Sequence, residues 1–168
     1  MASSIESFLL ELGLNSEIAV FIVSMIPIIE LRGAIPFGVG LGVKWHIAYI
    51  LSVIGNVIPV PFIILLFRPI IDYLEKTRLF GKIASKLKKR TTNKIDNMQK
   101  KNNAKKIGLF IFVAIPLPGT GAWTGAAIAA LMKMRLKDSV PIIVLGVMCA
   151  GLIMLGLSKL VELFVNLV

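Results

Sequence analysis

The chain has 168 residues, 57% of them hydrophobic, and its mean hydropathy is +0.86. A soluble domain of this length could not cover itself with polar surface at such a composition, so we predict an integral membrane protein. The formal net charge of +10 is compatible with nucleic-acid binding, but thirteen of the nineteen Lys and Arg residues lie between Arg68 and Lys106. Apolar segments flank this basic block, which indicates a cytoplasmic loop and no nucleic-acid partner.

The first long apolar segment, residues 18–42, is interrupted. Pro27, Pro36 and four glycines surround Glu30 and Arg32, the segment's only ionisable residues. A continuous membrane-spanning helix needs about 20 uninterrupted apolar residues, and this segment does not provide them. We therefore expect a re-entrant helical hairpin at about 18–42.

Residues 47–67 form a continuous apolar stretch between Lys44 and Arg68. This length is sufficient to cross a bilayer, so we predict a transmembrane helix here. Pro59 and Pro61 are expected to kink it, because proline cannot donate the backbone hydrogen bond of a helix.

Residues 69–106 form a basic connector. Its first part has apolar residues at helical spacing with Lys and Arg between them, which predicts an amphipathic helix on an anionic inner leaflet. Residues 91–106 are rich in Asn, Gln and Lys, and we expect them to be soluble or mobile. The residues expected to bind anionic lipids are Lys86, Lys88, Lys89 and Arg90.

The second apolar half repeats the order of the first. Residues 107–131 are broken at 116–121, which predicts a second re-entrant hairpin, and residues 139–158 form a second span. The two halves align at an offset of 89 residues, with Pro27 on Pro116, Gly33 on Ala122, Pro36 on Gly125, Lys44 on Lys133 and His46 on Arg135.

These elements predict an all-α integral membrane protein with an inverted repeat. Each repeat is a re-entrant hairpin followed by a transmembrane helix, and the amphipathic cytoplasmic helix joins them. The single domain, 1–168, divides into halves at 5–68 and 107–168. We expect a multi-pass protein of the plasma or inner membrane, with a cytoplasmic connector and both termini outside. A plain helical bundle without a transport role is the alternative.

Glu30 and Arg32 are the first candidates for function, because a charge at membrane depth costs several kcal/mol unless it is paired or hydrated. The alternative is an ion pair between them that only holds the tip in place. At the opposing tip, Gly119, Thr120 and Gly121 precede a helix start, where free N–H groups attract anions. Together these residues predict a site for phosphate or carboxylate.

Asn56 is a polar residue within a predicted span. It either faces this site or bonds to a neighbouring carbonyl group. Cys149 has no partner cysteine, and no cluster of His, Cys and Asp suggests a metal site. We expect no cofactor and no enzymatic activity, because no nucleophile–base pair is evident.

Residues 27–38 (PIIELRGAIPFG) and 116–125 (PLPGTGAWTG) resemble the family of small multidrug export proteins, over nearly the whole chain. That family is similar to the wider DedA (SNARE-associated Golgi protein, VTT) superfamily, whose paired re-entrant hairpins are linked to proton-dependent translocation of lipids. The resemblance assigns Glu30 and Arg32 to the first motif, and Pro118, Gly119 and Thr120 to the second. DedA proteins commonly have Glu where this chain has Thr120.

Three functions remain open. The first is a proton-coupled transporter or flippase for an amphipathic anion such as a polyprenyl phosphate, with Glu30 exchanging the proton and Arg32 binding the head group. The second is proton-coupled export of small cationic compounds at Glu30, which Arg32 would oppose by repelling a cation. The third is a membrane scaffold that does not transport. With only two full spans per chain, we expect a homodimer.

Overall fold

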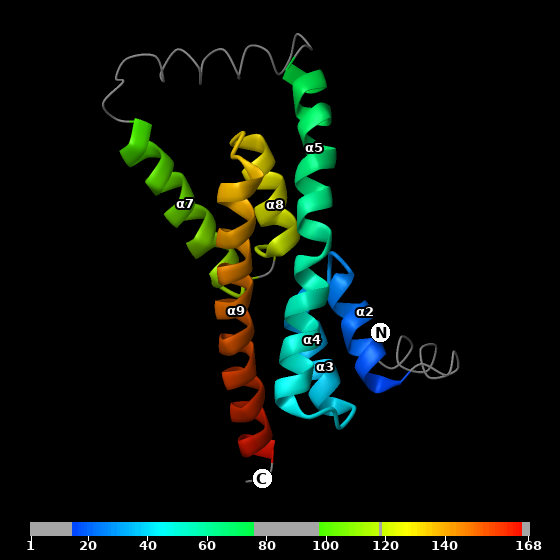
Figure 1. Cartoon of the computed structure of the whole chain (residues 1–168). Coiled ribbons are helices and arrows are strands. Elements are labelled where there is room, and N and C mark those ends of the chain that lie inside the picture. The colour runs from blue at the N-terminus through cyan, green and yellow to red at the C-terminus, as the bar shows by residue number, and fades with distance from the viewer. Residues whose placement is uncertain (1–14, 76–97, 118, 166–168) are drawn as a thin grey trace.

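The computed structural model describes residues 15–75, 98–117 and 119–165, and within these ranges all regular structure is helical. The amphipathic helix expected in the connector, with its four lipid-binding residues, lies mostly outside the described residues. Figure 1 shows the arrangement of the helices. They are α2 (Ser16–Met25), α3 (Glu30–Gly40), α4 (Trp45–Val57), α5 (Pro59–Glu75), α7 (Met98–Ala114), α8 (Ala122–Leu131) and α9 (Leu136–Val165).

Helices α2 and α3 form the first hairpin. The chain turns at residues 26–29, where Pro27 interrupts the helix, and α3 runs back along α2. The start of α2 and the end of α3 lie together, because Ser16 and Lys44 line the same pocket of about 360 Å³. The tip of this hairpin therefore points toward the middle of the molecule (Figure 1).

Helices α4 and α5 together form one long apolar helix, which is interrupted only at Ile58. The interruption precedes Pro59, whose ring nitrogen has no hydrogen to donate to the preceding turn. The apolar part, Trp45–Ile70, is long enough to cross a membrane, as is Leu136–Leu160 in α9. Both exceed the expected spans, 47–67 and 139–158, by a few residues at each end.

Helices α7 and α8 form the second hairpin, which enters the middle of the molecule from the opposite end (Figure 1). Helix α7 begins at Met98, so residues 98–106 of the segment that we expected to be soluble or mobile are helical. Lys and Gln are good helix formers, and two lysines of this segment also have tertiary partners. The Nζ of Lys105 donates to Met132 O at 3.3 Å, and that of Lys106 lies 2.8 Å from Asp138 Oδ1.

The turn after α3 recurs after α8. Leu41, Gly42 and Val43 donate N–H groups to Phe37, Val39 and Gly38, and Met132, Lys133 and Met134 donate to Ile128, Ala130 and Ala129 in the same way. Gly42 and Lys133 both have positive φ, 78° and 52°. Leu41 corresponds to Met132, which is an offset of 91 residues.

The offset of 89 therefore holds only up to the hairpin tips, where Met25 ends α2 and Ala114 ends α7. Beyond the tips the offset of 89 is wrong. The matching turns give an offset of 91 there, so Lys44 corresponds to Arg135 rather than to Lys133. The second tip, 115–121, is three residues longer than the first, 26–29, and α8 is one residue shorter than α3. Together these two length differences add two residues to the second half, which changes the offset from 89 to 91.

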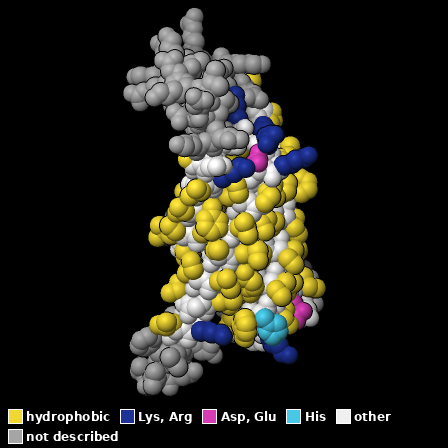
Figure 2. All heavy atoms as spheres, turned by 60° about the vertical axis from the view of Figure 1, so that its left-hand side comes forward, with side chains coloured by type: hydrophobic (Ala, Val, Ile, Leu, Met, Phe, Trp, Pro, Cys, Tyr) yellow, Lys and Arg dark blue, Asp and Glu magenta, His cyan; other side chains and the backbone are white. Residues whose placement is uncertain are grey.

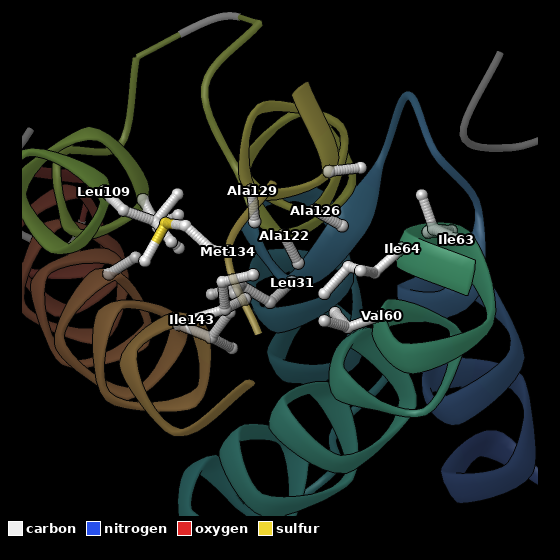
Figure 3. Packing of buried hydrophobic residues seen from close by; sticks show 14 of the residues in the cluster. Leu31, Val60, Ile63, Ile64, Leu109, Ala122, Ala126, Ala129, Met134 and Ile143 are labelled. Atoms are coloured by element: carbon white, nitrogen blue, oxygen red, sulfur yellow. The ribbon is translucent and has the colours of Figure 1, made fainter. Parts of the chain in front are cut away.

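The two halves interlock, because α8 packs against α5 and α3 packs against α9. The main core lies between these helices, and small residues along α8 let it approach closely (Figure 3). They are Ala122, Ala126, Ala129 and Ala130. Figure 2 shows a hydrophobic belt across the middle of one face of the molecule, with Lys and Arg side chains toward both ends. This is the surface of a helical membrane protein.

Candidate functional site

Glu30 begins α3 with a backbone conformation that few residues other than glycine adopt. Its φ is 51°, and its N–H donates to Ile26 O at 2.9 Å. A non-glycine residue in this region costs about 1–3 kcal/mol and persists only where the surrounding structure enforces it. The side chain is 6% exposed, so this turn holds a buried carboxyl group at the tip of the first hairpin.

The carboxyl group of Glu30 lies at the start of α8. Its Oε1 accepts the backbone N–H of Trp123 at 3.2 Å. The first N–H groups of a helix have no partner within the helix, and they carry the positive end of its dipole. The approach depends on Gly121, because a Cβ atom there would collide with the Glu30 carboxyl group.

Arg32, half-buried one half-turn further along α3, binds the loop that leads into α8. Its guanidinium donates to Leu117 O and, at 3.4 Å, to Ile115 O. Both carbonyl groups belong to residues that precede a proline in the sequence, Pro116 and Pro118. Such residues avoid the helical conformation, which leaves their carbonyl groups available to a guanidinium.

Thr120 is the third partner of Arg32. Its Oγ1 accepts from Arg32 Nη2 at 2.9 Å and lies 2.8 Å from Ile115 O, to which the hydroxyl can donate. Gly119 precedes it with φ of 81°, a conformation that favours glycine. The loop is therefore held in shape by Thr120 and Gly119 and clamped to the first hairpin by Arg32.

The structure brings together Glu30, Arg32, Thr120 and Gly121, while Gly119 lies exposed in the same loop. It differs from the expected arrangement in one respect: the helix start that we assigned to a bound anion is occupied by the chain's own carboxyl group. Glu30 and Arg32 do not pair with each other, since each contacts a different part of the second hairpin.

Asn56 lies on α4 and is completely buried, and neither its Nδ2 nor its Oδ1 has a hydrogen-bond partner in the described part of the protein. Of the two alternatives for Asn56, the bond to a neighbouring carbonyl group is not formed within the described residues. Ser52, one turn earlier, is likewise buried with an unpartnered Oγ. Ser52 and Trp123 were not among the site residues predicted from the sequence. The spacing of Ser52 from Asn56, four residues on one helix, was the available signal.

Within the described ranges, no three His, Cys, Asp or Glu residues gather in a way that could hold a metal ion. The chemistry of the site therefore comes from one carboxyl group, one guanidinium, a hydroxyl group and the N–H groups of a helix start. Such a set can bind an anion and exchange a proton.

The apolar surface, the two long helices and the contacts of Glu30 and Arg32 with the second hairpin define a helical membrane protein with a polar site between its halves. Residues 30–153 match the family described as "Putative small multi-drug export protein", and the chain belongs to this family. The description is that of a membrane transporter and not of an enzyme. Searches of curated proteins and of solved structures each found no match.

Proposed function

We propose that the protein is a proton-coupled membrane transporter or flippase for an amphipathic anion, such as a polyprenyl phosphate. The observation that carries this proposal is the position of Glu30, whose carboxyl group occupies the helix start of α8 next to Arg32. A site that accepts a carboxylate from its own chain has the chemistry to accept a phosphate.

In the membrane, both hairpins are re-entrant and the two halves form an inverted repeat. Three observations support this architecture: the hairpins enter from opposite ends, the turns after α3 and α8 have the same hydrogen bonds, and each hairpin packs on the long helix of the other half. Inverted repeats whose broken helices meet at the midplane are a recurring transporter plan.

The proton and the anion compete for one position. When Glu30 is charged, it occupies the N–H groups of α8 and excludes a second anion. Protonation removes its charge and weakens its hold on the helix start, so that a phosphate can bind there and to Arg32. Release of the proton restores the carboxylate and expels the ligand. Coupling in this scheme requires no direct contact between proton and substrate.

The ligand enters from the side. Leu117 and Gly119 are exposed and Arg32 is only half-buried, so we place the opening of the site at this loop, on the side of the molecule. An amphipathic molecule can reach such an opening with its head group while its chain stays among the lipids. In a homodimer, this open side is where the second copy would shield the site.

The basic end carries Arg68, Lys105 and Arg135, and we place it in the cytoplasm together with the connector. Both chain termini would then lie outside. The lysines and arginine at positions 86–90 would bind anionic lipids of the inner leaflet.

A second candidate is proton-coupled export of small cationic compounds, which the family description favours. Glu30 would then bind the cation. Arg32, two residues away and bonded to the same opposing tip, would repel it, and for this reason we rank this function second.

Transport in vesicles separates the two functions. The purified protein is reconstituted, and movement of a labelled polyprenyl phosphate and of a cationic dye is followed across a pH gradient. We expect proton-dependent movement of the lipid phosphate and none of the dye. Movement of the dye without movement of the lipid would favour export of cations. If neither compound moved, the remaining function would be that of a membrane scaffold that does not transport.

A further inference from the structure

Ser52 and Asn56 form a polar pair on α4 whose hydrogen bonds are not satisfied by the described protein. Both side chains are fully buried, and Ser52 Oγ, Asn56 Nδ2 and Asn56 Oδ1 have no partner. Other buried serines do not share this property, since Ser24 Oγ donates to Phe21 O at 2.6 Å and Ser139 Oγ to Arg135 O at 3.0 Å. An unpartnered buried amide is costly, and inside a membrane bulk water does not compensate for it.

Asn56 lies at the depth of Glu30. Gly38 of α3 contacts Ala48 of α4, because a Cβ on Gly38 would lie 3.1 Å from the Ala48 Cβ. The two helices run in opposite directions, so eight residues back along α3 and eight forward along α4 each rise about 12 Å. Eight residues before Gly38 is Glu30, and eight residues after Ala48 is Asn56, so the two residues lie at the same level along the helices.

A second contact, made by α5, also places Asn56 close to the level of Glu30. Val60, one turn beyond Asn56, belongs to the buried cluster that contains Leu31 and Ala122, and Figure 3 shows these three together. Leu31 follows Glu30 in the sequence, and Ala122 precedes Trp123. Asn56 is thus within about one helical turn of the level at which the two hairpin tips meet.

The unpartnered atoms indicate which ligand fits. The Asn56 amide offers two N–H donors and one acceptor, and the Ser52 hydroxyl offers both functions. A bare cation would satisfy only the acceptor oxygen atoms, and an anion only the N–H and O–H donors. Water satisfies both kinds of atom, and buried water typically makes about three hydrogen bonds to groups of this type.

We propose that Ser52 and Asn56 form a buried hydration site that holds water at the level of Glu30 and relays protons to and from its carboxyl group. The relay rests on the proposed function, in which Glu30 exchanges a proton, whereas the hydration site does not. The buried Ser24 on α2 packs against Gly55 of the same α4 turn, but its hydroxyl is already bonded.

Few charged or titratable groups face this site. Arg32 lies on the same helix as Glu30, α4 contributes Tyr49, whose hydroxyl donates to Met148 O at 3.1 Å, and α9 contributes Cys149. Helix α8 carries no charged residue, and the acidic residue of α2, Glu17, lies at the far end in the pocket beside Lys44. Among the described residues, a proton that reaches Glu30 from α4 therefore has no competing carboxyl group nearby.

Water-edited solid-state NMR on the reconstituted full-length protein tests the hydration site directly. We expect magnetisation to pass from water to the Asn56 side-chain amide nearly as fast as to the exposed Asn102, with the signal assigned by its loss in Asn56→Leu. The methyl group of the buried Ala126 is the dry control. Transfer to Asn56 as slow as to Ala126 would overturn the hydration site.

Transport tests the relay. Asn56→Leu should slow proton-coupled movement of the lipid phosphate about tenfold, Asn56→Ser should retain most of the rate, and Ser24→Ala, which removes a bonded hydroxyl at the same level, should leave it unchanged. Equal rates in Asn56→Leu and the unmodified protein would overturn the relay. If transport by Glu30→Gln kept its pH dependence, the proposed role of Glu30 in proton coupling would be wrong. The NMR result would still decide whether Ser52 and Asn56 hold water.

Discussion

The carboxyl group of Glu30 and the backbone N–H of Trp123 are hydrogen-bonded across 93 residues of sequence. This contact joins the tips of the two hairpins, and it places a buried carboxyl group at the positive end of the α8 dipole. Arg32 holds the same tip through two carbonyl groups and Thr120. The two charged residues, two positions apart, thus hold the same opposing tip, Glu30 at the start of α8 and Arg32 at the loop before it.

Glu30→Gln should abolish the pH dependence of transport while the fold remains intact. The amide keeps the shape of the carboxyl group, and its oxygen can still accept the Trp123 N–H, but it cannot exchange the proton. The measurement is lipid-phosphate transport at several pH values, with Glu17→Gln, at the end of the molecule, as control. A pH profile that survives the substitution would remove Glu30 from the coupling step.

Arg32→Lys should weaken both the tip contact and ligand binding, although it keeps the charge. A guanidinium reaches two acceptors with parallel N–H groups, whereas an ammonium group acts as a single point. Thr120→Val should have a smaller effect. It removes one hydroxyl group, whose hydrogen bond contributes about 1 kcal/mol to stability, while the contacts of Arg32 with the carbonyl groups remain. The measurement is the affinity of each variant for the lipid phosphate in nanodiscs, which should fall more in Arg32→Lys than in Thr120→Val. Faster dye export in Arg32→Ala, with unchanged lipid movement, would favour the cation exporter.

Gly121→Ala should destabilise the protein by about 1–3 kcal/mol, because the added methyl group occupies the position of the Glu30 carboxyl group. Thermal unfolding in detergent measures this change. Gly156→Ala is the matched control: no atom lies within 4 Å of the Cβ it would add on α9, so it should be neutral or slightly stabilising. If both variants unfolded at the same temperature, the tips would not be in contact in the membrane.

Cysteine labelling tests the topology. In a Cys149→Ser background, Asn15→Cys should react with a membrane-impermeant thiol reagent from outside, and Asn102→Cys only from the cytoplasm. Both positions are exposed and lie at opposite ends of the molecule. Labelling of the two positions from the same side would contradict the opposed hairpins.

The class of the fold could be read from the sequence. The all-helical membrane architecture and two long apolar helices were predicted from the length of the apolar runs, and the structure and the family confirm this coarse assignment. Re-entrant insertion stays a prediction. The composition of residues 98–106 did not reveal that α7 begins at Met98, because the partners of Lys105 and Lys106 lie on a distant part of the chain.

What the sequence by itself determined about this protein is local. Proline and glycine break both apolar segments, the basic residues gather at one end, and Glu30 and Arg32 fall at a tip, all of which follow from composition and the order of residues. Only the tertiary structure decided that Glu30 fills the start of α8, that Arg32 binds carbonyl groups rather than Glu30, and that Asn56 has no partner among the described residues. These contacts join segments far apart in the chain, and their geometry depends on how whole helices pack.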